Sequence, residues 1–199
     1  MTTRLDIVLV GLLCAAACGG DGEVVQGEAL TASTRARLLW KRNVTLEQDI
    51  MRALELAPDE VCTELGMASC TREVHHVALG GAAPFSLGLH KALPGPMLST
   101  AVVVDRVLLS ACSNRVTKDA EGPAVVFTAL ELDDEKAPSA GDEAFVTTVT
   151  ALYRRFLSRD PTDEEVSVFG ELVTEEMTAR EFAVLACYSV GSTTEFLFY

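Results

Sequence analysis

Two cysteines and two histidines lie close together in the sequence, and side chains of these types can support redox or metal chemistry. In the stretch CTELGMASCTREVHH, Cys62, Cys70, His75 and His76 fall within 15 residues. Seven residues separate the cysteines, whereas zinc sites commonly place two to four residues between paired cysteines. The C-x-x-C pattern of thiol oxidoreductases and the C-x-x-C-H pattern of haem attachment are both absent. The spacing therefore does not predict a metal site, although His75 and His76 are the residues that would supply one.

Neighbouring residues point about 100° apart on a helix and to opposite faces of a strand. We therefore expect at most one of His75 and His76 to be buried, packed near the cysteines, with the other in water. His90 lies in a stretch rich in proline and glycine and has no evident partner.

An even number of cysteines, apart from the two near the N-terminus, predicts two disulfides in an exported chain. Three pairings are possible, and we favour Cys62–Cys70 with Cys112–Cys187. Eight residues of unbroken helix would separate two Cα atoms by about 12 Å, which is too far for a disulfide. Gly66 can end the helix and let the chain turn back. The second bridge would close a long loop and stabilise the fold by about 4 kcal/mol. The alternative is four reduced thiols in the core.

Other catalytic patterns are missing from the sequence. It has no G-x-S-x-G, no phosphate-binding loop and no H-E-x-x-H. The acidic runs DDE and TDEE fall where turns and helix starts favour carboxylates. Arg154 and Arg155, in LYRRF, could clamp a phosphate or carboxylate, but an outer edge that pairs with the acidic surface is the simpler interpretation. We assign no catalytic residue and expect no cofactor.

The N-terminus has the features of an export signal. The apolar run from Ile7 to Cys18 is 12 residues long, too short to cross a bilayer as a helix, and three alanines precede its last residue. Cleavage after Ala17 would remove a signal peptide, residues 1–17, and leave Cys18 first, which resembles the bacterial lipobox. Residues 18–32 would then be a lipidated cysteine and a glycine-rich, acidic, flexible tether. The alternative is ordinary secretion, with Cys18 left as a thiol.

The net charge of −13 at pH 7 restricts the partners. Such acidity argues against nucleic acid and against anionic lipid headgroups, which carry charge of the same sign. The signal and the predicted disulfides favour an exported protein held by its N-terminal lipid, in the periplasm or at the outer-membrane surface.

Apolar residues recur at helical spacing along most of the remaining chain, so we predict a single, mainly α domain over residues 33–199. The polar stretch DDEKAPSAGDE divides it into sub-regions 33–132 and 142–199. Residues 79–98 form a Gly/Pro-rich central loop. Residues 124–132 are either a short strand or an extended packed segment. Helices are expected over 34–43, 46–56, 58–66, 99–115, 142–158, from Thr162 onward, and from Thr178 to Gly191.

Local signals set several of these boundaries. Capping boxes are expected at Thr45-x-x-Gln48, Thr162-x-x-Glu165 and Thr178-x-x-Glu181. The apolar end of the chain, STTEFLFY, should pack back on the domain, with Phe196, Leu197 and Phe198 sealing its core. The alternative is that these three side chains form an exposed apolar patch.

Two stretches carry a resemblance to known proteins. The pattern Leu-x-Arg-x-Pro-Thr-x-x-Glu at Leu157–Glu165, with the later Thr194–Leu197, resembles the C-terminal helical region of large secreted bacterial proteins of unknown function. The resemblance covers residues 145–199. Those proteins often carry cytochrome c domains, but the haem motif is missing here. The stretch CTELG…C…VHHVALGG resembles the core of small uncharacterised bacterial lipoproteins. Neither resemblance implies a reaction.

The sequence therefore favours a non-catalytic exported lipoprotein that binds or positions another secreted or surface protein. The alternative is a redox or metal-dependent accessory protein that uses Cys62, Cys70 and His75. A small-ligand binding module would need a pocket, which the sequence does not show.

Overall fold

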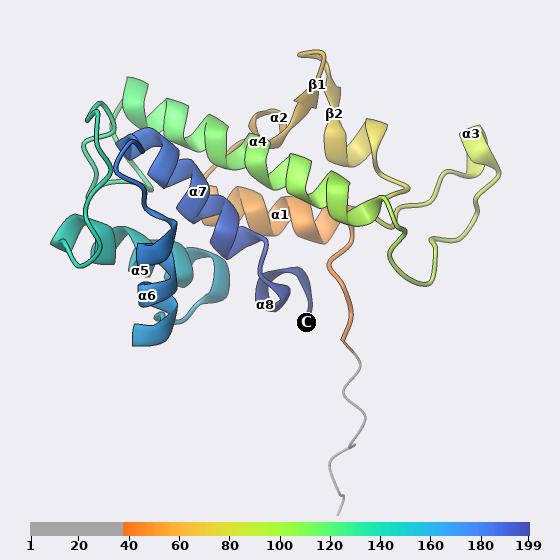
Figure 1. Cartoon of the computed structure of the whole chain (residues 1–199). Coiled ribbons are helices and arrows are strands. Elements are labelled where there is room, and N and C mark those ends of the chain that lie inside the picture. Colours follow the sequence, from red (N-terminus) through yellow and green to blue (C-terminus); the bar gives the residue numbers. More distant parts are fainter. Residues whose placement is uncertain (1–37) are drawn as a thin grey trace, which may run out of the picture. The chain divides into compact units, whose positions relative to one another are not determined.

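Helix α4 (Thr100–Glu121) runs alongside α1 (Asn43–Leu54) and α7 (Ala179–Gly191) in the computed structural model, which describes residues 38–199 (Figure 1). The mainly helical fold is confirmed, with the addition of one small two-stranded sheet. The predictions for the signal peptide 1–17, for Cys18 and for the tether 18–32 lie outside the described residues. The elements are α1 (Asn43–Leu54), α2 (Pro58–Val61), β1 (Thr63–Glu64), β2 (Ala68–Ser69), the π-helical turn η1 (Cys70–Val74), α3 (Pro84–Leu87), α4 (Thr100–Glu121), α5 (Glu143–Leu157), α6 (Asp163–Leu172), α7 (Ala179–Gly191) and α8 (Thr194–Leu197).

The core lies where α1, α4, α5 and α7 meet. Helix α1 buries the stripe that its spacing predicts, which comprises Leu46, Ile50, Ala53 and Leu54. From the C-terminal part of the chain, Phe145 on α5 stacks on Phe182 of α7, with ring centroids 5.3 Å apart. Side chains from both predicted sub-regions therefore share one apolar cluster.

Both predicted disulfides are confirmed. The Cα atoms are 5.4 Å apart in Cys62–Cys70 and 5.8 Å apart in Cys112–Cys187. Gly66 is the point where the chain reverses, as expected, with a φ of 70° that favours glycine. The reversal is the turn of the β1–β2 hairpin, however, because helix α2 ends at Val61 rather than at Gly66.

Two predictions about the first helices are wrong. Instead of a helix over residues 34–43, the described part, residues 38–42, is extended, and Trp40 forms an antiparallel bridge with Phe198. The end of the chain supplies backbone partners that no local pattern reveals. The capping box at Thr45 is absent, because α1 already begins at Asn43 with Arg42 as its N-cap.

Helix α4 extends to Glu121, beyond the expected end near Arg115. The reason is a buried pair: the guanidinium of Arg115 lies 2.6 Å from the carboxylate of Asp119, and both side chains are almost fully buried. The same carboxylate accepts the backbone N–H groups of Val125, Val126 and Phe127, each at 2.9 Å. This contact fixes the start of segment 124–132, which is packed but forms no strand.

The C-terminal helices begin where the sequence predicts. The hydroxyl oxygens of Thr162 and Thr178 each accept a hydrogen bond from the backbone N–H three residues later. In return, the carboxylates of Glu165 and Glu181 accept the backbone N–H groups of these two threonines. Among residues 38–199, no helix combines the length and apolar character needed to cross a membrane.

Candidate functional site

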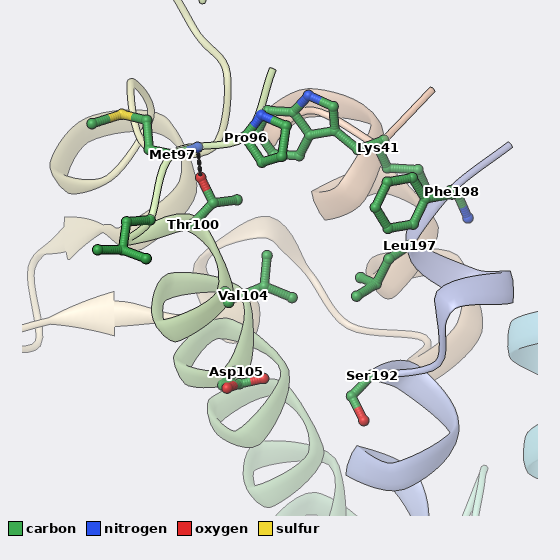
Figure 2. Close-up of a pocket in the computed structure, with 12 residues that line it drawn as sticks. Lys41, Pro96, Met97, Thr100, Val104, Asp105, Ser192, Leu197 and Phe198 are labelled. Carbon is green, nitrogen blue, oxygen red and sulfur yellow. Dashed lines mark hydrogen bonds between the residues drawn. The ribbon is translucent and has the colours of Figure 1, made fainter. Parts of the chain in front are cut away.

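An apolar groove with a volume of about 470 Å³ is the best candidate for a binding site (Figure 2). It lies where three parts of the chain meet: the leading segment (residues 38–41), the tail (residues 197–199) and the first turns of α4. The leading segment and the tail belong to opposite ends of the described chain. The groove therefore exists only in the folded protein.

Backbone hydrogen bonds join the leading segment to the tail. Leu39 and Tyr199 exchange two N–H···O bonds of 2.9 Å, and the N–H of Lys41 donates to the carbonyl of Leu197 at 2.8 Å. The Trp40 ring then lies over Gly80, where a Cβ atom would come within 2.7 Å of ring atom Cζ2. Gly80 also has a φ of 83°, so both its backbone and the close approach of the ring require glycine.

The opposite wall comes from the start of α4 and the residues before it. The Thr100 hydroxyl donates to the Ala78 carbonyl at 2.6 Å and accepts the N–H of Met97 at 2.8 Å. These two bonds hold the rim at Met97 against the domain. Val104, one helical turn after Thr100, lies across the groove from Leu197 (Figure 2).

The three apolar residues predicted to seal the core do so only in part. Phe196 is buried, with its ring edge against Phe156 at a centroid distance of 4.9 Å. Leu197 and Phe198 are half-buried and line the groove. Lys41, also in the lining, places Nζ 4.1 Å from the Phe196 ring centroid. Phe196 therefore belongs to the core, whereas a partner can reach Leu197 and Phe198.

One end of the groove is polar. Asp105 on α4 and Ser192 after α7 lie there on opposite sides (Figure 2). Burial, together with a hydrogen bond to the Asp105 carboxylate, raises the pKa of the Tyr188 phenol. The Tyr188 phenol is therefore a neighbour of the Asp105 carboxylate at this end of the groove.

The cysteines and histidines between Cys62 and His76 do not converge on one site. Cys62 and Cys70 are buried and bonded to each other. His75 Nε2 lies 3.1 Å from a Glu64 carboxylate oxygen, and Nδ1–H of His76 donates to a backbone carbonyl at 3.1 Å. Both histidines are half-buried. The expectation that at most one of them is buried therefore holds, but the expected division into one packed and one wet histidine does not.

Across the described chain, no group of three His, Cys, Asp or Glu side chains is arranged to hold a metal ion. The geometry thus gives no support to a site built from Cys62, Cys70 and His75, because two of its three members are already joined in a disulfide.

The two arginines of LYRRF pair with acidic side chains, as expected. Arg154 forms a 2.5 Å ion pair with Asp160, and Arg155 forms one of 2.8 Å with Glu55. Arg155 also donates to the backbone carbonyl of Val125 at 2.9 Å. These contacts occupy both guanidinium groups and explain the pair structurally.

Arg159, within the Leu-x-Arg-x-Pro-Thr motif, connects the two stretches that carry the resemblance. Its guanidinium donates to both carboxylate oxygens of Glu165 at 2.8 and 2.7 Å, and to those of Glu195 at 2.8 and 2.6 Å. The hydrogen bonds from Arg159, and then that from the Thr162 N–H, lower the pKa of Glu165 to about 2. The motif thus fixes α8, and with it the tail.

Sequence reasoning missed the groove. Its lining comes from residues that are ordinary when taken singly, and only the pairing of the leading segment with the tail brings them together. Comparison with family models, with curated proteins and with solved structures gave no match.

Proposed function

We propose that this chain is an exported, lipid-anchored docking protein, and that its groove receives an apolar segment of another exported protein. The observation that carries this proposal is the groove itself. Its volume is within the range of binding pockets, and its walls are mainly apolar and aromatic. A concave apolar site of this kind suits the aromatic or aliphatic anchor residues that dominate protein interfaces.

The rim supports a partner larger than a small molecule. Leu98, in the lining before α4, is almost fully exposed, and Leu38 and Tyr199 are exposed near lining residues in the leading segment and the tail. Contiguous exposed apolar side chains around a hollow are typical of interaction surfaces. A partner segment that fills the groove would cover these residues as well.

The polar groups of the lining favour binding over catalysis. Lys41 Nζ is held 2.8 Å from the Asp49 carboxylate, and the Ser192 hydroxyl donates to the Ser189 carbonyl at 3.2 Å. No histidine is among the described lining residues, so Ser192 has no neighbouring imidazole to act as a base.

The anchor and the location belong to the same proposal. Two disulfides in so small a domain suit an oxidising compartment outside the cytoplasm. Lipidation at Cys18 would hold the domain at a periplasmic or outer-membrane surface. The test is membrane fractionation of a Cys18→Ala variant with a carbonate wash, which strips proteins that are bound only peripherally; the washed variant should appear in the soluble fraction. If it stays in the washed membranes as the unmodified chain does, the lipid anchor is wrong.

The groove can be blocked without touching the core. Ala101 lines the groove on the exposed side of the first turn of α4, where a carboxylate also suits the helix N-terminus. Ala101→Glu should therefore fold normally and place a charge in the apolar groove. Val102→Glu is the matched control, since Val102 is exposed on the same turn but is not part of the lining.

The measurement is crosslinking and recovery of the anchored protein from its own cell envelope. A partner that Val102→Glu retains and Ala101→Glu loses would support docking in the groove. Equal recovery by both variants, or no protein partner with the parent, would refute it. Trp40 is the single tryptophan of the chain, so its emission reports binding of the recovered partner's peptides to the purified domain.

A further inference from the structure

Acidic residues are absent from one long part of this acidic chain. The protein has 29 Asp and Glu residues, yet residues 74–104 contain none. Their ionisable side chains are Lys91, His75, His76 and His90, and these include every histidine of the protein. The middle of this stretch, residues 82–92, is named here the apolar loop. It surrounds helix α3, which lies well away from the helical body (Figure 1).

The apolar loop is held firmly at its base. Ala83 and Leu89 exchange two backbone hydrogen bonds of 3.0 and 3.1 Å, and Ala83 is buried. Below this pair, the guanidinium of Arg42 donates to the carbonyls of Gly80 and Leu93 at 3.3 and 3.2 Å. The chain between Ala83 and Leu89 therefore projects outward from a base that these hydrogen bonds hold in place.

Large apolar side chains occupy the tip of the loop. Phe85 is fully exposed, and Leu87 is 69% exposed. Neither gains burial from the domain, although the loop is anchored only a few residues away. Exposed apolar side chains on a projection, rather than in a hollow, have no pocket to fill on their own protein, and such patches mark contact surfaces.

We propose that the tip of the apolar loop, Phe85 and Leu87, inserts into the interfacial region of a lipid bilayer with zwitterionic headgroups. The charge distribution of the loop favours a lipid bilayer as its partner. An acidic side chain near the tip would have to lose water among the headgroups, and the loop has none. Lys91 and His90 are exposed close to the tip, where the phosphates of the headgroups can pair with them.

A fluid bilayer also suits the shape of the loop. A convex tip needs a matching pocket on a protein partner, whereas lipid chains rearrange around any apolar projection. The acidic remainder of the protein would be repelled by an anionic surface, so a neutral bilayer is the expected target. This contact is separate from the groove, which lies at the start of α4.

The chain contains a matched control. In the turn of the β1–β2 hairpin, Leu65 is 93% exposed and Met67 is 84% exposed, but this turn follows the acidic Glu64. If exposure alone produced membrane binding, both projections would bind. If membrane binding also requires the absence of nearby acidic groups, only the apolar loop will bind.

The test is flotation of the full chain with phosphatidylcholine vesicles, in a Cys18→Ala background so that no lipid anchor contributes. The parent should float with the vesicles. Phe85→Ser with Leu87→Ser should lower the partition coefficient at least about tenfold, because burial of one side chain of this size is worth about a decade or more. Leu65→Ser with Met67→Ser should not change it. Circular dichroism checks that each variant keeps its helices.

Three outcomes would overturn the proposal. The parent does not float, or both double variants float equally well, or Phe85 and Leu87 are required to capture a protein while vesicles are ignored. The last result would make the loop a protein interface. Ala101→Glu, which blocks the groove, should float as the parent does, so a failure here is distinguishable from a failure of the docking function.

Discussion

Replacement of Phe196 and of Phe198 by alanine removes the same atoms from two positions of very different burial. Phe196 is only 1% exposed, packs edge-on against Phe156 and lies under the ammonium of Lys41. Phe198 is half-buried in the wall of the groove. The pair therefore separates what the tail contributes to stability from what it offers to a partner.

The expected magnitudes follow from burial. Phe196→Ala should lower the free energy of unfolding by about 3–5 kcal/mol, since a buried phenyl ring leaves a cavity that tight packing cannot close. Phe198→Ala should cost only about 1–2 kcal/mol, because its ring already contacts water in the native state. A domain of this kind has about 5–15 kcal/mol of stability in total, so both variants should fold but Phe196→Ala will be close to its limit.

Urea unfolding followed by circular dichroism, without reducing agent, measures both values. Partner capture is then measured on the two folded variants. We expect Phe196→Ala to lose the larger part of the stability and to retain capture, whereas Phe198→Ala should lose little stability and lose capture. Equal stability losses would show that the tail behaves as one unit. A loss below about 1 kcal/mol for Phe196→Ala would contradict its assignment to the core.

Three further predictions concern the polar contacts and the glycine beneath the groove. The pKa of Glu165 is about 2, below its usual 4.5, so its contribution to stability is complete above pH 4.5 and is lost as the pH falls toward 2; Arg159→Ala should flatten this part of an acid-unfolding curve. Asp119→Ala should cost about 3–5 kcal/mol in urea unfolding, because it leaves Arg115 buried without its partner. Gly80→Ala should lower the thermal midpoint and shift the tryptophan emission, because a methyl group there strains the backbone and displaces the ring that lines the groove.

The sequence predicts those parts of the fold that local interactions determine. The capping boxes at Thr162 and Thr178 start α6 and α7 through hydrogen bonds between residues only three apart. A short sequence pattern therefore contains all the information needed to predict them. The Cys62–Cys70 bridge is of the same kind, because Gly66 between the cysteines shows where the chain can reverse.

The remaining features depend on partners far away in the sequence. Residues 38–41 have the composition of a helix, but their backbone groups pair with the tail instead. Helix α4 runs past Arg115 because Asp119 has three N–H groups to bind after the helix ends. The half-burial of Leu197 and Phe198 likewise depends on α4. The sequence of three adjacent apolar residues could therefore not show that Phe196 alone seals the core.

The pairing of the leading segment with the tail connects the groove to the proposed anchor. If the protein is held through its N-terminus, any pull on the domain arrives at the leading segment, where the bonds between Leu39 and Tyr199 receive it. The tail can resist this pull because Arg159 binds Glu195 on α8, just before the tail, and Glu165 at the start of α6. Arg159 therefore supports the groove indirectly: it keeps the tail in place, and the tail holds both the leading segment and one wall of the binding site. The motif around Arg159 thus fixes the tail, and the fixed tail forms one wall of the groove.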